Sequence, residues 1–453
     1  MHGRCFTCLL LVFVLAAPAA AKPWRLGEAL DLSESLSLTV EHRQRFESLD
    51  SQFRRGRDGR VRALAVRTLV HARWQATDFL AFGGELLDAR AWPGEKDTPL
   101  DTGIVNALEL LQGYAELSGE VARGRTTARV GRITMDVGSR RLVARNRFRN
   151  TINAFTGVDA EWRGERGRSV RIFYTLPVQR RPTAASDLRD NQAEYDRESF
   201  DLDFWGVHLG ADLPCGDHAE LYLFGLHEDD RPGRPSRDRQ LYTPGFRLRR
   251  APQAGAFDYE IESVLQLGRS RSSTSSARDL DHLAHFHHGE LGFSFGAPLS
   301  PRVALQYDYA SGDEDPSDGD NERFDTLFGA RRFDFGPTGF YGPFVRANVH
   351  TPGLRVQAKP GKRVSAFAAY RLYWLASDED AWVVAGVNDP SGDSGTFLGS
   401  QLELRVRWDV VPGNLRLEGG FAHLFEERFA NDAPNSNGQG DPTFFYTQAV
   451  LSF

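Results

Sequence analysis

Long stretches of the chain alternate between apolar and polar residues, and this pattern predicts β-strands. In residues 256–268 the large apolar residues share one parity, and the acidic residues share the other. The same alternation occurs in residues 36–46, 364–376 and 398–408. Because successive side chains of a strand point to opposite faces, each segment predicts a strand with one apolar face and one charged face.

These alternating segments are long enough to cross a membrane. They run for about 11 to 13 residues, whereas strands of soluble sheets usually have five or six, and a tilted strand needs about 9 to 11 to span a bilayer. A soluble β-sandwich would alternate in the same way but with shorter strands, so the pattern favours an all-β transmembrane barrel. Aromatic residues stand near segment ends, where such barrels carry aromatic girdles: Trp74, Tyr307, Tyr309, Trp374 and Trp408.

The connections between the expected strands alternate in length. Short turns occur at residues 76–78, 214–217, 297–300, 360–362 and 411–414. Long polar connections occur at residues 93–102, 180–197, 229–240, 270–281, 311–321, 377–394 and 426–441. Short periplasmic turns and long external loops are typical of outer-membrane barrels. We therefore expect one antiparallel transmembrane barrel over residues 22–453 with about 18 strands, 16 also being compatible, whose last strand ends on Phe453.

The first 21 residues have the pattern of a secretory signal peptide. Arg4 provides the positive start, an apolar run follows to Leu15, and small residues precede a cleavage site after Ala21. An N-terminal membrane anchor is the alternative, but this run is too short to span the bilayer and Pro18 interrupts it. The predicted product is therefore exported and located in a bacterial outer membrane, with Cys215 as its one cysteine.

The charged residues change the picture of the barrel interior. The formal net charge is −6 without any basic block, which argues against a nucleic-acid partner. Only four basic residues are lysine. Arginine enrichment can simply reflect a GC-rich genome, but planar guanidinium groups also bind carboxylates, phosphates and sulfates.

Arginines are the candidate binding residues of the predicted pore. Five of them fall between residues 140 and 149, and others lie on the charged parity of predicted strands. The candidates are Arg43, Arg45, Arg67, Arg129, Arg140, Arg141, Arg145, Arg147, Arg149, Arg405 and Arg407. The alternative is structural: wall arginines can pair with acidic residues of the same face, as we expect for Arg405 near Glu403, and the 140–149 cluster can lie on a solvated rim.

Two clusters raise the question of a metal, and no cofactor is expected from either. Asp313, Asp315, Asp318 and Asp320 crowd a glycine-containing loop over residues 311–321, where oxygen ligands suit calcium, but their spacing differs from the EF-hand and favours a solvated acidic loop. The histidines of residues 282–288 are divided by strand parity, since His285 and His287 face the lipid and His288 faces the lumen. No phosphate-binding loop or nucleophile motif is recognisable, so an enzyme is not expected.

Three segments give the chain a resemblance to a known family. They are residues 131–158 with Gly138-Ser139-Arg140-Arg141-Leu142-Val143, residues 309–329 with Tyr309-Ala310-Ser311-Gly312-Asp313, and residues 398–425 with Gly419-Gly420-Phe421-Ala422-His423. In their order and spacing the chain resembles the alginate-export family of outer-membrane barrels. It departs from the usual pattern at Gln401-Leu402-Glu403 and at Glu426-Glu427-Arg428.

The resemblance implies a monomeric barrel of about 18 strands whose arginine-lined constriction passes polyanionic polysaccharide. We accordingly expect a passive channel for an anionic polysaccharide or its oligomers, embedded in outer-membrane lipid and served by periplasmic export or uptake partners. Two alternatives stay open: a general porin for small carboxylates, and a plugged barrel that acts as a scaffold or adhesin.

Overall fold

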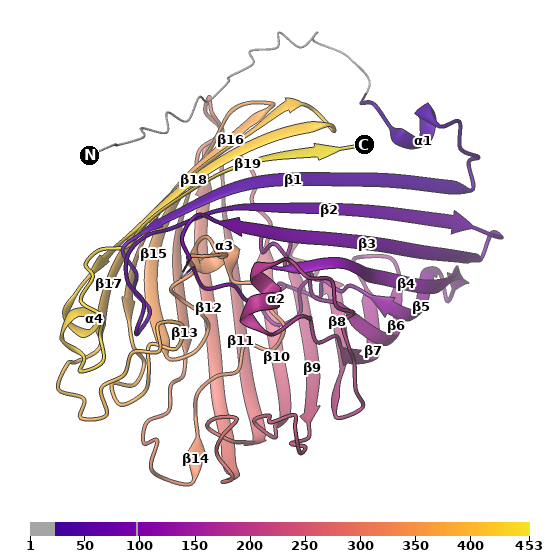
Figure 1. Cartoon of the computed structure of the whole chain (residues 1–453). Coiled ribbons are helices and arrows are strands. Elements are labelled where there is room, and N and C mark those ends of the chain that lie inside the picture. The colour runs from indigo at the N-terminus through magenta and orange to yellow at the C-terminus, as the bar shows by residue number, and fades with distance from the viewer. Residues whose placement is uncertain (1–22, 97) are drawn as a thin grey trace.

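The computed structural model describes residues 23–96 and 98–453, so the predicted signal peptide over residues 1–21 lies outside the described residues. The chain forms a closed antiparallel β-barrel (Figure 1). Its strands are β1 (Leu36–Asp50), β2 (Val61–Gln75), β3 (Leu80–Pro93), β4 (Asn106–Val121), β5 (Gly124–Ile133), β6 (Phe155–Arg163), β7 (Ser169–Pro177), β8 (Leu202–Asp212), β9 (His218–Glu228), β10 (Gln240–Arg250), β11 (Ala256–Ser270), β12 (Leu280–Ser294), β13 (Arg302–Ala310), β15 (Val349–Gly361), β16 (Val364–Trp374), β17 (Phe397–Val411), β18 (Leu415–Glu426) and β19 (Thr443–Ser452).

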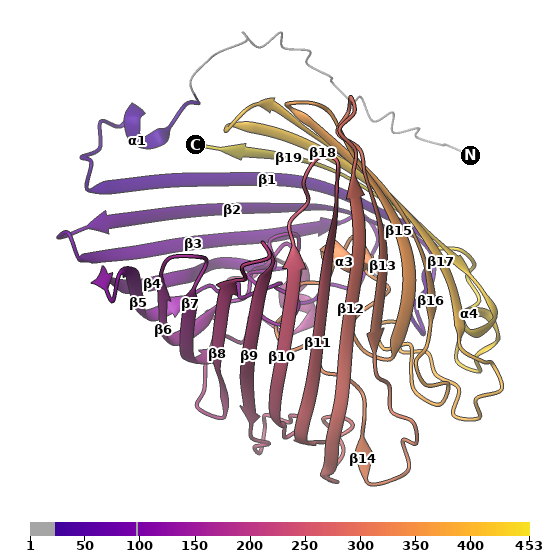
Figure 2. The ribbon, with the colours of Figure 1, turned by 180° about the vertical axis from the view of Figure 1, so that it is seen from behind.

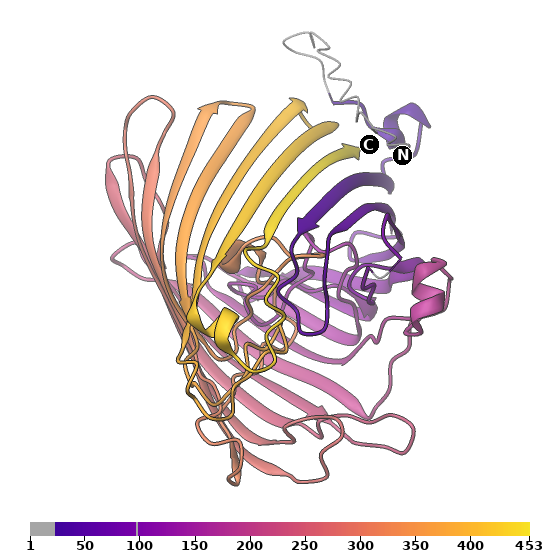
Figure 3. The same cartoon turned by 60° about the vertical axis from the view of Figure 1, so that its left-hand side comes forward.

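Each of these strands pairs antiparallel with its neighbours in chain order, and β19 closes the sheet on β1. Figure 3 shows this seam, with the C-terminal strand beside the first strand. The two-residue strand β14 (Asp320–Asn321) stands apart, because it pairs parallel with β12 from within a loop while β13 pairs directly with β15. The wall therefore has 18 strands, which confirms the predicted fold class and count.

The connections differ in length at the two ends of the barrel. One end has turns of two to seven residues, and the other has loops of nine to 38 residues. Figure 2 shows β8 to β13 side by side in the wall, running between these two ends. We call them the short-turn end and the long-loop end; in outer-membrane barrels they are periplasmic and external, respectively.

The outer face of the wall is apolar and the inner face is charged, as the alternation predicts. Large outward side chains such as Leu221, Ile261 and Leu305 are exposed, whereas inward charged residues such as Glu262 and Arg371 are buried. None of the helices in residues 23–96 and 98–453 is long and apolar enough to cross a membrane. They are α1 (Leu26–Ala29), α2 (Ala185–Arg189), α3 (Arg332–Phe335) and α4 (Arg428–Asp432).

Two long connections fold into the barrel and fill much of it. We call residues 134–154, between β5 and β6, the first inner segment, and residues 311–348, between β13 and β15, the second inner segment. Figure 1 shows α3, part of the second segment, inside the ring of strands. Residues of both segments are buried in one hydrophobic core with aromatic residues of the wall: Val137, Leu142, Val143, Phe335, Tyr341, Phe344, Phe155, Phe173 and Phe204.

The two inner segments are joined by their backbones. The Phe328 N–H donates to the Leu142 carbonyl at 2.9 Å, and the Ala144 N–H donates to the Phe328 carbonyl at 3.2 Å. Gly329 permits this approach, because a Cβ there would lie 1.7 Å from the Arg141 carbonyl oxygen. The second inner segment extends well beyond the predicted connection at residues 311–321, and the first inner segment was not predicted as a connection.

Candidate pore site

Three wall arginines hold the first inner segment in place. Arg43 donates to the carbonyls of Arg147 and Phe148 at 3.1 Å, and Arg67 donates to the Arg147 carbonyl at 2.9 Å. Arg45 donates to the Phe148 carbonyl at 2.7 Å and is fully buried. A hydrogen bond that involves a charged group contributes about 1.5–3 kcal/mol, so these three side chains act mainly as a clamp on the segment backbone.

A cavity of about 430 Å³ lies between the inner segments and the wall, toward the short-turn end. We call it the short-turn cavity. Its wall residues come from β1, β2, β17, β18 and β19, and its other residues come from both inner segments. Seven of the predicted arginines line it: Arg43, Arg67, Arg140, Arg145, Arg147, Arg405 and Arg407. Arg416, which lies on the charged parity of its strand, lines it as well, and so does Arg332, which was not predicted.

Several arginines of this cavity are neutralised by carboxylates, and several are not. Arg407 pairs with Glu418 at 2.7 Å, and Arg145 pairs with Glu85 at 2.6 Å. Among the described residues, no carboxylate lies within ion-pair distance of the predicted arginines Arg140, Arg147 or Arg405. Arg140 lies over the ring of Phe333, and Arg405 lies over the ring of Phe367.

A second cavity of about 450 Å³ lies toward the long-loop end. We call it the long-loop cavity. It is lined by Asp101 and by three arginines from three different connections, Arg149, Arg180 and Arg331. In the described part of the chain none of these guanidinium groups forms an ion pair; they donate instead to neutral oxygens, as Arg149 does to Asn153 Oδ1 at 2.5 Å. The cavity is therefore more positive than its single carboxylate can balance.

Burial, and after it the crowding of like charges, lowers the pKa values of two of these arginines. Burial and the neighbouring Arg180 hold the pKa of Arg149 well below its usual range. Burial, together with Arg54 and Arg346, lowers the pKa of Arg331 to about 10. An anion in the cavity would relieve the repulsion between these like charges.

Asn146 lines both cavities. It stands in the first inner segment between Arg145 and Arg147, with a φ of 56°, which is a left-handed conformation that asparagine tolerates better than most residues. Asn146 therefore lies where a path between the two cavities would run. This residue marks the candidate constriction.

The remaining predicted arginines lie outside the two cavities. Arg129 pairs with Glu116 on the wall at 2.8 Å, and Arg141 is buried in ion pairs with Glu260, Glu262 and Asp334. The expected pairing of Arg405 near Glu403 was wrong, because Glu403 pairs with Arg332 at 2.5 Å.

Three arginines that line the cavities from loops were not predicted. Arg180, Arg331 and Arg332 belong to connections, and strand parity gives no information on where a loop side chain points. The one available signal was position, since Arg331 and Arg332 come two and three residues after the family-like segment of residues 309–329.

The acidic loop and the histidines behave differently. Within the described residues, the sole group of three side chains with ligand atoms close enough for a metal is His288, Asp308 and Asp334. The structure thus does not gather Asp313, Asp315, Asp318 and Asp320 into a metal site. Asp315 accepts a hydrogen bond from the Ser317 N–H. Asp313 is buried, and its N–H donates to the Asp380 carboxylate. His285 and His287 lie on the outer face, as predicted, and His288 points inward and is buried.

An 18-strand closed barrel with an apolar exterior and a charged, partly filled interior defines the class of outer-membrane channels. A family model described as "Alginate export" matches residues 34–439, so the chain belongs to the alginate-export family, which confirms the resemblance. It is a channel of the bacterial outer membrane and not an enzyme.

Solved outer-membrane proteins share the fold at low sequence identity. OpdK from Pseudomonas aeruginosa is 13% identical with a TM-score of 0.60, covering 93% of this chain and 99% of its own. OccK9 (OpdG) from the same organism is 13% identical with a TM-score of 0.62, covering 93% and 98%. OccAB3 from Acinetobacter baumannii is 11% identical with a TM-score of 0.59, covering 93% and 100%. No curated protein matches the chain.

Proposed function

We propose that this channel passively passes acidic saccharides, as an anionic polysaccharide or its oligomers, along the arginines of its two cavities. One observation carries the proposal: arginines without an ion-paired carboxylate line both sides of the Asn146 constriction within the described residues. They are Arg149, Arg180 and Arg331 in the long-loop cavity and Arg140, Arg147 and Arg405 in the short-turn cavity.

The physical basis is uncompensated charge in a confined space. Low-dielectric walls focus the field of such charges and raise the local concentration of anions. A guanidinium group can also bind a carboxylate through two parallel hydrogen bonds. Acidic saccharides carry repeated carboxylates, so a chain of them can move from one free arginine to the next. Membership of the alginate-export family supports this substrate class.

The size of the cavities favours a second candidate, a porin for small carboxylates. Volumes of about 430 and 450 Å³ suit a compact solute, and the inner segments occupy the space that a polymer would need. One structural neighbour, OpdK, has a crystal structure with vanillate, a small aromatic carboxylate. Both candidates require anion selectivity and differ in the length of the solute.

Anion selectivity is tested by reversing two arginines, one in each cavity. In planar bilayers with a salt gradient, we expect Arg147→Glu combined with Arg149→Glu to move the reversal potential toward cations. The shift should shrink as the salt concentration rises from about 0.1 to about 1 M, because the screening length falls from about 10 to about 3 Å.

The control reverses the charge of an arginine that lies away from the cavities. Arg234 lies in the connection between β9 and β10 and lines neither cavity, so Arg234→Glu should leave the reversal potential near that of the wild type. Equal reversal potentials for the wild type and the double variant, with both conducting, would refute the arginine pathway.

The length of the solute is tested by current block. An acidic oligosaccharide and its monosaccharide are each added to the long-loop side of single wild-type channels. The proposed function predicts block by the oligosaccharide at lower concentration, with dwell times that lengthen with chain length. Block by the monosaccharide alone would favour the small-carboxylate porin, and the absence of conductance would favour a plugged scaffold.

A further inference from the structure

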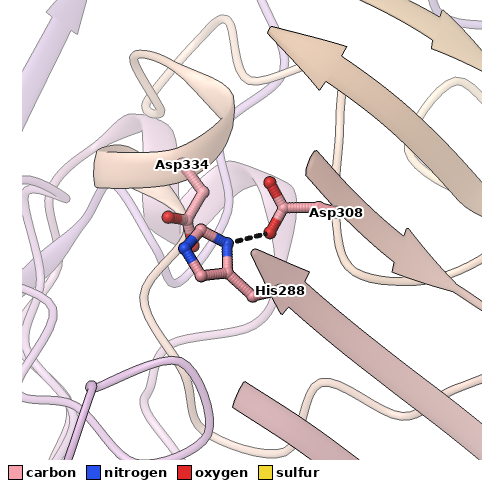
Figure 4. Close-up of side chains that lie close together, drawn as sticks. All are labelled: His288, Asp308 and Asp334. Carbon is pink, nitrogen blue, oxygen red and sulfur yellow. Dashed lines mark hydrogen bonds and ion pairs between the residues drawn. The ribbon is translucent and has the colours of Figure 1, made fainter. Parts of the chain in front are cut away.

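A buried histidine connects the barrel wall to the second inner segment. His288 lies on β12, faces inward and is 3% exposed. Its Nδ1 lies 2.7 Å from Asp308 Oδ1 on β13, the cross-strand partner of His288. Figure 4 shows the other ring nitrogen beside the carboxylate of Asp334, which comes from α3 in the second inner segment.

The hydrogen-bond chemistry of the ring depends on its protonation. The Asp308 carboxylate can only accept, so Nδ1 carries a hydrogen. In a neutral ring, Nε2 would then hold a lone pair that faces Asp334 and also Glu260, whose Oε1 is 4.0 Å away. Nε2 is buried and has no hydrogen-bond partner. A second proton would turn Nε2 into a donor between two carboxylates, which removes an unfavourable buried acceptor.

Charged groups from six other elements or segments surround the ring. Carboxylates come from β11, β13 and α3, and guanidinium groups come from the first and second inner segments, β10 and β16. The carboxylates are Glu260, Glu262, Asp308 and Asp334; the guanidinium groups are Arg141, Arg247, Arg346 and Arg371. Arg247, which pairs with Glu260, also forms an ion pair with Glu220 at 3.0 Å. His208 lies 3.4 Å from the Glu220 carboxylate. The ion pairs thus join five carboxylates and four arginines, and His218 lies 3.5 Å from Glu220 as well.

A proton suits this cluster better than a metal ion. Both oxygens of Asp334 already accept hydrogen bonds from Arg141, at 3.0 and 3.2 Å. Asp308 accepts from Arg371 at 2.7 Å on the oxygen that does not face His288. A divalent ion would have to displace these guanidinium groups and would leave positive charges unpaired in a buried site.

The position of α3 bears directly on the pore. Asp334 is preceded by Arg331, which lines the long-loop cavity, and by Arg332 and Phe333, which line the short-turn cavity. We propose that the proton on His288 latches α3 to the barrel wall, and that loss of this proton loosens the second inner segment and opens the path between the cavities. The latch does not depend on which anion passes.

The experiment follows α3 and the current together as the pH is raised. Hydrogen–deuterium exchange of residues 332–335 and single-channel conductance are measured on the folded barrel from about pH 5 to about pH 9. We expect wild-type protection of these amides, corrected for the intrinsic exchange rate at each pH, to fall about tenfold, the equivalent of about 1.4 kcal/mol, while conductance rises. His288→Gln should show neither change with pH, because the amide side chain does not titrate.

Controls separate the latch from other titrating groups. His285→Gln changes a histidine on the same strand that faces outward, and it should keep the wild-type pH response. All variants are compared in an Asp313→Asn background, because Asp313 is a second buried titratable group of the second inner segment. If His288→Gln does not fold, Asp334→Asn is used in its place, because this variant removes the carboxylate that faces Nε2 of His288. An unchanged pH response in these variants, or no response in the wild type, would overturn the latch.

Discussion

The ring of Trp24 meets the ring of Phe453 edge to face, with 5.0 Å between the ring centroids and 84° between the planes. Trp24 precedes β1, and Phe453 is the last residue after β19. Val40 of β1 and Phe453 exchange backbone hydrogen bonds at 3.2 and 2.9 Å. Asn414 lies in the turn between β17 and β18. Its side-chain oxygen accepts a hydrogen bond from the Trp24 N–H, and its side-chain nitrogen donates one to the Trp24 carbonyl, both at 2.8 Å. The two ends of the described chain therefore meet at the seam that closes the barrel.

Deletion of Phe453 should reduce barrel closure. It removes the aromatic pair, which contributes about 0.5–1.5 kcal/mol beyond its buried area, and the two backbone hydrogen bonds to Val40. The measurement is the yield of the compact, heat-modifiable form on gels, and Trp24→Ala should lower that yield less. Phe257→Ala is the control, because Phe257 is an exposed aromatic at the same end of the barrel but away from the seam. Equal yields for the deletion and this control would show that Phe453 is not required for closure of the barrel.

Cysteine labelling should report the orientation of the barrel. Ser186 and Ser273 lie exposed in loops of the long-loop end, whereas Cys215 lies exposed in a turn of the short-turn end. In a Cys215→Ser background, Ser186→Cys and Ser273→Cys should react with an impermeant maleimide on intact cells. Cys215 of the wild type should react only after the outer membrane is opened. External labelling of Cys215 with protection of residue 273 would reverse the assignment of the two ends.

Loosening the arginine clamp should make the current noisy. Arg43→Gln removes the charged donors to the carbonyls of Arg147 and Phe148, at a local cost of about 1.5–3 kcal/mol. We expect a rise in mean conductance and in open-channel noise in planar bilayers while the barrel still folds. Arg129→Gln is the matched control, because Arg129 is a wall arginine that pairs with Glu116 and contacts neither inner segment. If Arg43→Gln keeps the mean conductance and the open-channel noise of the wild type, Arg43 does not hold the first inner segment in place.

The sequence was sufficient to predict the wall. Alternation identified the strands within a few residues: the expected strand at residues 398–408 is β17, Phe397–Val411. This works because lipid selects one parity and the polar lumen selects the other, so each residue carries information about its own face. The same parity placed Arg43, Arg67, Arg405 and Arg407 inward, where they line the short-turn cavity.

The interior was less predictable, since it depends on contacts between distant loops. Nothing in the local pattern indicates that residues 134–154 and 311–348 fold inward and meet at Gly329. Parity also cannot separate the wall arginines that hold the loops, such as Arg45, from the wall arginines that face a cavity without an ion-paired carboxylate, such as Arg405. That distinction rests on ion pairs between residues far apart in the chain.

Asp313 should make the second inner segment sensitive to pH in the acidic range. Burial, followed by the nearby Asp380, raises the pKa of Asp313 to about 6, against the opposing effect of Arg323. Since the folded state then holds this proton more tightly than the unfolded state, local stability is highest at low pH and is lost as the pH rises from about 4 to about 6. Hydrogen-exchange protection around residues 311–325, corrected for the intrinsic exchange rate at each pH, should fall by about ten- to a hundredfold over this range. Asp313→Asn should remove the effect, and its persistence in that variant would assign it to another group.

Removing the side chain at the candidate constriction should widen the pore without changing its selectivity. Asn146 lines both cavities, and its φ of 56° suits glycine, so Asn146→Gly keeps the backbone while deleting the side chain. We expect the single-channel conductance to rise and the reversal potential in a salt gradient to stay near the wild-type value, because the free arginines remain in place. Thr326→Gly is the control, since Thr326 lines the long-loop cavity alone, and it should change conductance less. If Asn146→Gly conducts as the wild type does while Thr326→Gly conducts more, the narrowest point lies within the long-loop cavity and not between the two cavities.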